Sequence, residues 1–457
     1  MSDTHVVILA AGQGTRMKSQ LPKVLHCISG QPLIEHVLRT ASSISPSSTV
    51  VVVGHEADTV RERLGRWSGL SYAQQEPQLG TAHALQQAET ALAGKQGTLV
   101  LLSGDVPLLS RHTLSRLLEV HREARAAATV VTAVVERPFG YGRIVRTEGR
   151  IARIVEERDA SRAERALKEI NSGIYAFDLQ PLWDALRGIA SQNAQGEFYL
   201  TDLVGIYRRR KLPVETLVVD NPDEIRGINS RTELADVSGI VRQQKNEEVM
   251  AAGVTLIDPA TTYIEPDVEI GPDTVIHPGV ILEGQTTIGA ACEIHSHVRI
   301  ADSVIGNKVT VNDFCVLTGV QVADEAAIGP FAHLRQQASV GEGAKVGNFV
   351  ELKKTSLGPG SKAMHLTYLG DATIGAKVNV GAGTITCNYD GTGKHPTIIE
   401  DGAFIGSDSQ LVAPVTIGKG AYVGSGSTVR KDVPAGALAV SAGKQRNIED
   451  WVEKRNK

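Results

Sequence analysis

A loop near the amino terminus has the residues of a phosphate-binding turn. It covers residues 9–17, overlaps the end of the apolar run of residues 6–9, and contains Gly12 and Gly14. Glycines allow a ligand to approach the main chain closely, and the N–H groups of such a loop can bind phosphate oxygens. Met17 stands where a dinucleotide-binding fingerprint and a Walker A loop both require glycine, so neither motif fits. A plain turn from a strand into a helix is the alternative explanation of the two glycines.

Asp105 is the candidate metal ligand in the same half of the chain. It follows the apolar run of residues 99–102 and the pair Ser103-Gly104. In a parallel α/β sheet, ligands bind at the carboxyl ends of the strands, and a carboxylate there can hold a metal ion bound to phosphates. Taken alone, Asp105 is also well explained as a turn residue that ends a strand.

A second group of polar residues lies in the carboxyl-terminal half. His365 stands where a six-residue repeat is interrupted, although a lone histidine is more often a satisfied surface or core residue. Arg335 and Lys353 are 18 residues apart, so the coils of a β-helix would stack them, and two stacked cations suit a phosphate. Tyr368 and Asn379 fall close to His365 in the same scheme. The group predicts a phosphate-binding site, with a bare β-helical scaffold as the alternative.

The elements that must position the first group alternate between two patterns up to about residue 229. Short, β-branched apolar runs indicate buried strands, and the stretches between them have helical patterns. This alternation predicts a Rossmann-like α/β domain with a parallel sheet covered on both faces. The predicted strands are residues 6–9, 50–53, 99–102 and 129–131, and the predicted helices are residues 33–41, 81–93 and 110–124.

A helix and a long repeat follow. Ser230 and Glu233 have the spacing of a capping box, which predicts a linker helix over residues 230–250. Beyond it, aliphatic residues recur every six positions, as in a left-handed parallel β-helix of hexapeptide repeats, where they point to the axis. Residues 362–370 and the turn-rich segment 388–394 interrupt the repeat. The repeated positions are Ile264, Ile270, Ile276, Leu282, Ile288, Ile294 and Ile300, then Val322, Ile328, Leu334, Val340, Val346 and Leu352, then Ile399, Ile405, Leu411, Ile417, Val423 and Val429.

Composition limits the function classes. The chain has 457 residues and a net charge of −4, so it has no excess of basic residues for binding nucleic acid. Its four cysteines form no C-x-x-C pair, which predicts reduced thiols and no zinc ribbon. The apolar run at residues 6–11 is too short for a signal peptide, and no apolar stretch is long enough to span a membrane. We therefore expect a cytoplasmic protein without membrane or nucleic-acid partners.

Further motifs carry a resemblance to a known family. Gly12-x-Gly14-Thr15-Arg16, followed by the Leu-Pro-Lys of residues 21–23, resembles the signature of the sugar-1-phosphate nucleotidyltransferases. From residue 5 to about residue 440, the chain resembles the bacterial bifunctional N-acetylglucosamine-1-phosphate uridylyltransferases/glucosamine-1-phosphate N-acetyltransferases. The resemblance implies a uridylyltransferase domain over residues 1–229 and a β-helical N-acetyltransferase domain over residues 251–457. Other segments that agree are residues 78–82, 103–105, 141–144, 171–175 and 227–229.

For the first domain, the resemblance implies that N-acetylglucosamine-1-phosphate attacks the α-phosphorus of UTP and that pyrophosphate leaves. Asp105 and Asn229 would hold Mg²⁺, while Arg16 and Lys23 would face the triphosphate as catalytic residues. The attacking phosphate needs no strong base, so catalysis would rest on positioning and charge stabilisation. The residues expected to bind UTP or UDP-N-acetylglucosamine are Leu9, Ala10, Ala11, Gly12, Lys23, Gln75, Gly80, Thr81, Ser103, Gly104, Asp105, Gly142, Glu156, Asn171 and Asn229.

For the second domain, the resemblance implies acetyl transfer from acetyl-CoA to glucosamine-1-phosphate. His365 would be the general base that takes a proton from the amine, and an imidazole suits this step because its ordinary pKa lies near neutrality. Glu351 would orient His365. A homotrimer is implied, because active sites in such β-helices form between neighbouring chains. The residues expected to bind glucosamine-1-phosphate are Arg335, Lys353, Tyr368 and Asn379, and those expected to bind acetyl-CoA are Ala382, Asn388, Tyr389, Ser407 and Ser425.

Three positions depart from the family pattern. Ser103 replaces a more usual aromatic residue, and Met364 replaces a small one. Ala442 stands where relatives usually carry the arginine of a CoA-phosphate contact, for which Lys444 or Arg446 could substitute. Two rival hypotheses are a single-activity pyrophosphorylase with a regulatory β-helix and a non-enzymatic assembly scaffold. If both activities are present, the product is expected to supply peptidoglycan and lipopolysaccharide synthesis, and thereby cell shape.

Overall fold

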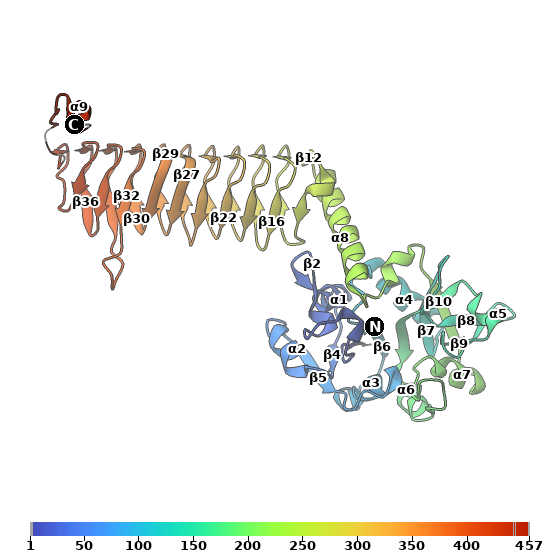
Figure 1. The fold of residues 1–457 in the computed structure, drawn as a ribbon. Helices are drawn as coiled ribbons and strands as arrows, with labels where there is room; N and C mark the ends of the chain where they lie inside the picture. Colours follow the sequence, from blue (N-terminus) through green and yellow to red (C-terminus); the bar gives the residue numbers. More distant parts are fainter. Residues whose placement is uncertain (1–2, 442, 444, 456–457) are drawn as a thin grey trace. The chain divides into compact units, whose positions relative to one another are not determined.

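The computed structural model describes residues 3–441, 443 and 445–455 (Figure 1). Ala442, the position of the relatives' arginine, and Lys444, one of its two possible substitutes, lie outside these residues. Contacts divide the chain into two compact units, residues 1–241 and 242–457, and the division falls inside helix α8 (Arg231–Ala251). The domain limits at residues 229 and 251 therefore stay predictions. Within the described residues, no helix is long and apolar enough to cross a membrane.

A nine-stranded sheet forms the centre of the first unit, and its strands follow the order β11-β7-β10-β6-β1-β4-β5, with β8 paired to β10 and β9 paired to β8. Four strands confirm the predicted apolar runs, namely β1 (Thr4–Leu9), β4 (Ser48–Val53), β6 (Thr98–Ser103) and β7 (Ala128–Val134). The other strands of this unit are β2 (Cys27–Ile28), β3 (Gln31–Pro32), β5 (Leu70–Gln74), β8 (Arg143–Thr147), β9 (Arg150–Val155), β10 (Glu169–Asp178) and β11 (Val214–Val218).

Helices cover both faces of this sheet, as the continuous apolar strands require. Along β1, Val6 and Ile8 pack into one apolar cluster and Val7 into another, so each face of the strand has its own core. The first core includes α1 (Leu33–Ser42), α2 (Ala57–Arg63) and α4 (Arg111–Glu123), and the second includes α3 (Thr81–Gln86), α6 (Leu179–Leu186) and α7 (Asp202–Arg209). The predicted helices are confirmed, although the one over residues 81–93 ends at Gln86 and continues as a short 3-10 turn, Thr90–Leu92.

One strand corrects the prediction of a parallel sheet. β10 lies between β6 and β7 and runs antiparallel to both. Its register with β7 shifts between Asn171 and Tyr175, where Gly173 has a φ of 79°. The irregular segment lies beside Ser103 at the carboxyl end of β6, because a Cβ added at Gly173 would come within 3.5 Å of Ser103 Oγ. Residues 171–173 of the antiparallel strand therefore lie at the ligand edge of the sheet.

Helix α8 begins as the capping box predicts. Ser230 Oγ accepts a hydrogen bond from the Glu233 amide at 3.2 Å, and Glu233 Oε2 accepts one from the Ser230 amide at 3.0 Å. The same carboxylate oxygen accepts a bond from the Asn229 amide at 2.6 Å. The cap fixes the direction in which the chain leaves Asn229.

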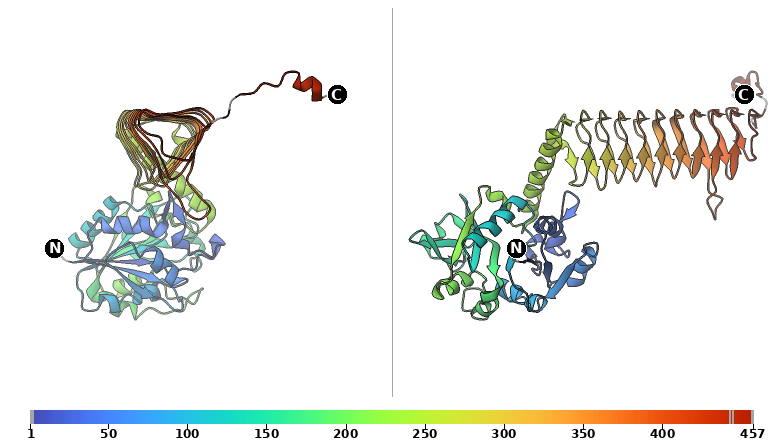
Figure 2. Two further views of the ribbon diagram at one scale, coloured as in Figure 1. Left: turned by 90° about the vertical axis from the view of Figure 1, so that its left-hand side faces the viewer. Right: turned by 180° about the vertical axis from the view of Figure 1, so that it is seen from behind.

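The second unit is a parallel β-helix whose coils are triangular in cross-section (Figure 2). Its strands run from β12 (Thr255–Leu256) to β39 (Leu438–Ala439) and pair with the strand one coil away. The six-residue pattern is confirmed, because all of the repeated aliphatic positions are buried except Ile270, which is partly buried. One set of successive coils contains β15 (Val275–Ile276), β16 (Ile281–Glu283), β17 (Thr287–Ile288), β18 (Glu293–Ile294), β19 (Arg299–Ala301) and β20 (Val304–Ile305).

The two predicted interruptions have different outcomes. Residues 362–370 do not break the ladder: they form a nine-residue strand, β29 (Lys362–Gly370), that runs through a corner beside β27 (Lys345–Lys353). The register pairs Asn348 with His365 and Lys353 with Gly370. The extrusion near residues 388–394 is confirmed as a loop that projects from the coils (Figure 1), closed by a bridge between Tyr389 and Lys394.

Candidate active sites

Three polar side chains meet at the ligand edge of the first unit. Lys23 Nζ donates to Asp105 Oδ2 in a short ion pair and to Asn229 Oδ1 at 3.1 Å. The Lys23 and Asp105 side chains are only 15% and 17% exposed. The two predicted metal ligands therefore direct oxygens at one point, where the lysine ammonium now supplies the positive charge. A carboxylate and an amide oxygen, with phosphates completing the shell, are the ligands that Mg²⁺ prefers, so these residues fit that ion.

The surrounding main chain holds this group in place. The Ile228 amide donates to the Asp105 carbonyl at 3.0 Å, which ties the end of β6 to the segment before α8. Burial, followed by the charges of Glu233 and Asp105, raises the pKa of Tyr141, which places this phenol beside the same group. Asp105 and Glu233 are therefore acidic groups beside Tyr141 whose negative charge a bound cation would balance.

The glycine-containing loop of residues 9–17 contacts the group of Lys23, Asp105 and Asn229 through Gly14. This residue has a φ of 63°, and a Cβ here would lie 2.6 Å from Lys23 Cβ, so glycine lets the loop pack over the lysine. The Gly104 amide donates to the Leu9 carbonyl at 2.9 Å, which joins the ends of β1 and β6. Gly12 and Arg16 are exposed on the loop. No hydrogen bond or ion pair joins Arg16 to this group in the described part of the chain, so its role stays a prediction.

A second part of the edge contains Gln75, Gly80 and Thr81. Gln75 is buried, and its Nε2 donates to the Gly80 carbonyl at 3.0 Å. Gly80 has a φ of 108°, and a Cβ there would lie 2.7 Å from the Phe198 carbonyl oxygen. Thr81 Oγ1 accepts a bond from the Leu200 amide at 3.2 Å. Only glycine fits this turn, which is held against residues 197–200.

A third part of the ligand edge contains Gly142, Glu156 and Asn171. A Cβ at Gly142 would lie 3.4 Å from Glu156 Oε1 and 3.6 Å from Asn171 Cβ, so the three residues are in contact. Burial raises the pKa of Glu156; a hydrogen bond from Thr201 opposes this shift, and Asp159 adds to it. A carboxyl group that is costly to ionise suits a neutral, hydroxylated ligand such as a sugar ring.

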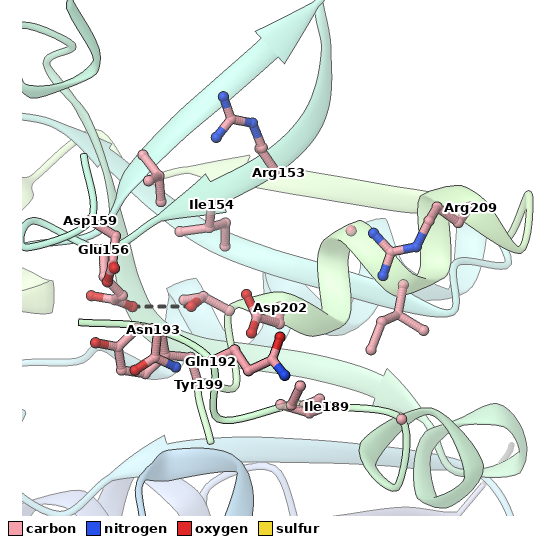
Figure 3. Close-up of a pocket in the computed structure, with 16 residues that line it drawn as sticks. Arg153, Ile154, Glu156, Asp159, Ile189, Gln192, Asn193, Tyr199, Asp202 and Arg209 are labelled. Atoms are coloured by element: carbon pink, nitrogen blue, oxygen red, sulfur yellow. Dashed lines mark hydrogen bonds between the residues drawn. The ribbon is translucent and has the colours of Figure 1, made fainter. Parts of the chain in front are cut away.

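Glu156 also lines a cavity of about 400 Å³ on the side of α7 (Figure 3). Glu156 and Asp159 lie together at one end of the pocket, and Arg209 lies at the other. Of the residues predicted to bind nucleotide or sugar, only Glu156 lines it. The cavity therefore borders the predicted site and does not contain it.

His365 lies at a corner of the second unit, exposed to solvent. Its Nδ1 lies 2.7 Å from Asn348 Oδ1, one coil away. An oxygen acceptor fixes the proton on Nδ1 and leaves the Nε2 lone pair free to take a proton. Glu351, the predicted orienting residue, instead accepts from Arg335 Nε at 2.7 Å. Asn348 therefore makes the contact to His365 Nδ1, and the orienting role of Glu351 stays a prediction.

A cluster of cationic and amide groups lies after the same corner. Lys353, whose side chain is 5% exposed, pairs with Asp371 at 3.0 Å, and Asn388 Nδ2 donates to the same carboxylate oxygen. Asn388 Nδ2 also lies 3.4 Å from the Tyr368 hydroxyl. Lys394 of the projecting loop lies close to Lys353, and the neighbouring ammonium lowers the pKa of Lys394. Two lysines this close make an anion site.

The remaining predicted residues of this unit are less closely grouped. Asn379 pairs in register with Lys362 at the start of β29, whereas Tyr368 pairs with Ile385 near its end, so a corner separates Asn379 from the cationic cluster. Ala382, Ser407 and Ser425 follow one another down the corner: the Asp408 amide donates to the Ala382 carbonyl at 2.7 Å, and the Gly426 amide to the Ser407 carbonyl at 2.8 Å. Tyr389 is exposed on the projecting loop.

Comparison with known proteins agrees with both units. A MobA-like NTP transferase domain matches residues 6–172, and bacterial transferase hexapeptide repeats match residues 267–302 and 396–431. Proteins named bifunctional protein GlmU are similar over the whole chain. That of Trichlorobacter lovleyi is 50% identical over 100% of this chain and 99% of its own, and that of Brevibacillus brevis is 51% identical over 99% and 98%. That of Halalkalibacterium halodurans is 46% identical over 100% of both chains.

The chain belongs to the GlmU family. Membership confirms the predicted fold class, an α/β nucleotidyltransferase domain followed by a left-handed parallel β-helix of hexapeptide repeats. It also confirms that the protein is a bifunctional transferase, which removes the scaffold hypothesis. For a GlmU protein, the two groups of residues described above are the natural candidates for its two active sites.

Four residues of this GlmU protein join the candidate sites although sequence reasoning missed them: Glu233, Asn348, Asp371 and Lys394. Asp371 follows Lys353 by 18 residues, so the coil spacing used for Arg335 and Lys353 could have found it, whereas Asn348 precedes His365 by only 17. Glu233 was recognised only as a cap. Lys394 stands in the projecting loop, where no spacing rule applies.

Proposed function

We propose that the protein makes UDP-N-acetylglucosamine in two steps at two separate sites. In the carboxyl-terminal unit, glucosamine-1-phosphate takes the acetyl group of acetyl-CoA. In the amino-terminal unit, the resulting N-acetylglucosamine-1-phosphate displaces pyrophosphate from UTP. Membership of the GlmU family and the two matching transferase domains support both reactions and their order. The observation that carries the proposal is that each unit contains its own charged group suited to one of these reactions.

In the uridyl-transfer step, a phosphate oxygen of the sugar attacks the α-phosphorus of UTP, and the bond to pyrophosphate breaks. Asp105 and Asn229 would hold Mg²⁺, which supplies stabilisation of phosphate charge when bound. Lys23 lies between these two oxygens and is placed to neutralise a phosphate oxygen once they bind the ion. The bond from the buried Gln75 amide to the Gly80 carbonyl fixes the turn beside which the nucleobase would bind.

In the acetyl-transfer step, the sugar amine attacks the thioester carbonyl. The new N–C bond forms, the C–S bond breaks, the sulfur of CoA leaves, and the amine proton goes to His365 Nε2. Asn348 holds the proton on Nδ1, so the base presents its free nitrogen. Lys353, Lys394 and Arg335, which is in register with Lys353 one coil earlier, would hold the sugar phosphate. Ala382, Ser407 and Ser425, in successive coils, would line the acetyl-CoA site.

The active form is a homotrimer. Asn379 and the cationic cluster are separated by a corner of one chain, which is expected if a neighbouring chain completes each site. A ladder of stacked rings lies along another row of corner residues: His297, Phe314, Phe331 and Phe349 have centroids 5.1–5.2 Å apart. The three phenylalanine side chains are 46–55% exposed. Exposing a row of apolar rings to water is unfavourable in free energy, and packing between chains would bury them. Sedimentation of the active protein at three times the chain mass tests this; an active monomer would contradict it.

Two assays on one preparation test the proposed function. Release of CoA from acetyl-CoA with glucosamine-1-phosphate reports the first step, and release of pyrophosphate from UTP with N-acetylglucosamine-1-phosphate reports the second. We expect both, the second lost in EDTA and restored by Mg²⁺. Pyrophosphate release without acetyl transfer would favour a pyrophosphorylase with a regulatory β-helix. We place both reactions in the cytoplasm, where acetyl-CoA and UTP are available, and expect the product to serve peptidoglycan and lipopolysaccharide synthesis.

A further inference from the structure

A group of two histidines and a glutamate lies on the β-helix, more than 30 residues before the earliest residue of the acetyl-transfer group. His277 follows β15 and His295 follows β18, and the register pairs Ile276 with Ile294, so the two histidines occupy the same position in successive coils. Their rings stack with centroids 4.6 Å apart and an interplanar angle of 16°. This separation is close to the spacing of neighbouring strands, about 4.8 Å, so the main chain itself holds the rings together.

Glu293 joins the two rings. Its Oε1 lies 3.3 Å from His277 Nε2 and 3.5 Å from His295 Nε2, so one carboxylate oxygen faces the same nitrogen of both rings. Among the residues that the structure describes, this is the one group of three histidine, cysteine or acidic side chains whose ligand atoms all lie within 4.8 Å of one another. The side chains are 25–50% exposed, which leaves an open side toward solvent.

The separations suit a small divalent cation. Zinc binds histidine nitrogen and carboxylate oxygen at about 2.0–2.2 Å in tetrahedral geometry, which puts neighbouring ligand atoms about 3.3–3.5 Å apart. The two nitrogen-to-oxygen distances already have this length. Because an imidazole binds a metal in its ring plane and the two rings are stacked nearly parallel, one ring has to turn out of the stack for both Nε2 atoms to reach the same ion. Two imidazoles and one carboxylate are also the ligands that such a cation prefers, in contrast to the all-oxygen pair of Asp105 and Asn229, which suits magnesium.

We propose that His277, His295 and Glu293 form a binding site for one zinc-class transition-metal ion per chain, with water as the fourth ligand. Because the ligands come from two successive coils, the ion joins those coils side to side. It stabilises the amino-terminal end of the β-helix against local opening, since binding to the folded state alone raises stability. A surface ion pair, in which the glutamate merely shares its oxygen between two histidines, is the rival explanation.

The test is titration of the chelator-treated full-length protein with Zn²⁺ by calorimetry, and with Co²⁺ by visible absorption. We expect one Zn²⁺ site per chain, Co²⁺ bands of tetrahedral intensity, and a higher thermal midpoint in Zn²⁺. His277→Gln should weaken Zn²⁺ binding by more than about tenfold, because loss of even a supporting contact of a metal ligand costs that much. Glu293→Gln keeps the ring stack and the side-chain volume, and it should also weaken binding.

His333→Gln removes another exposed histidine of the β-helix and is the matched control, with Zn²⁺ affinity unchanged. Asp105→Ala removes a ligand of the proposed magnesium site. It should also leave the Zn²⁺ affinity unchanged, because Zn²⁺ is expected to bind at His277, His295 and Glu293. The proposal is overturned if the His277→Gln and Glu293→Gln proteins bind Zn²⁺ as tightly as the unmodified protein. Octahedral Co²⁺ spectra, or no binding to the unmodified protein, would overturn it equally.

Discussion

Asn348 gives the sharpest test of the acetyl-transfer site. In the proposed mechanism His365 takes the amine proton, so its imidazole would become positively charged and its Nδ1–H bond to Asn348 Oδ1, 2.7 Å long, would strengthen. A hydrogen bond to a charged group contributes about 1.5–3 kcal/mol, so Asn348→Ala should lower kcat for acetyl transfer roughly 10- to 150-fold. Asn348→Asp keeps the acceptor and adds a negative charge, which favours the imidazolium form. It should move the acid limb of the kcat/KM profile to higher pH by up to about one unit.

The assay is CoA release with glucosamine-1-phosphate as a function of pH, with uridyl transfer measured on the same samples. Asn312→Ala is the matched control, because Asn312 lies two coils away at the same corner and its Nδ2 donates to the Ile328 carbonyl at 3.0 Å instead of to His365. Both activities should survive in that control. An Asn348→Ala protein with full acetyl-transfer activity, or an Asn348→Asp protein with an unshifted profile, would refute the orienting role.

Three further predictions concern the first unit. Asp105→Ala should abolish pyrophosphate release and spare CoA release; residual uridyl transfer at saturating Mg²⁺ would count against the metal assignment. Gly80→Ala puts a Cβ 2.7 Å from the Phe198 carbonyl oxygen at a φ of 108°, so kcat/KM for UTP should fall at least about tenfold, as steady-state kinetics would show. Burial lowers the pKa of His121 to about 4 from 6.5. The unfolded imidazole therefore takes up a proton between pH 7 and 5 while the folded one does not, and the free energy of unfolding should fall by about 2 kcal/mol. In urea unfolding, His121→Gln should remove that loss, and an equal loss in both proteins would contradict the assignment.

The β-helix could be predicted from sequence because its pattern records burial directly. Each coil places an aliphatic residue on the axis every six positions, and the stacking of Ile276 on Ile294, 18 residues later, follows from that spacing alone. In the first unit, local patterns located the strands but not their directions. A strand such as β10, which contributes apolar residues to both cores, has the same pattern whether it runs parallel or antiparallel.

Sequence patterns could bring some residues of the candidate sites together, but not others. Lys23 and Asn229 are 206 residues apart, and no periodicity joins them, so only a family resemblance could place them together. The contact between Asn348 and His365 was missed because of the corner: the coil from β27 to β29 is 17 residues long, which sets Asn348 beside His365 and Glu351 beside Tyr368. Sequence spacing alone did not reveal this coil length, because both strands run through the corner.

The central claim, that one chain performs two reactions in sequence at separate sites, can be tested by mixing two inactive variants. Asp105→Ala should retain only acetyl transfer, and His365→Asn only uridyl transfer. Each protein alone, given glucosamine-1-phosphate, acetyl-CoA and UTP, should form no UDP-N-acetylglucosamine. Their mixture should form it after a lag in which N-acetylglucosamine-1-phosphate accumulates. If the mixture stays inactive while each variant retains its single activity, or if His365→Asn alone makes the product from glucosamine-1-phosphate, the account is contradicted.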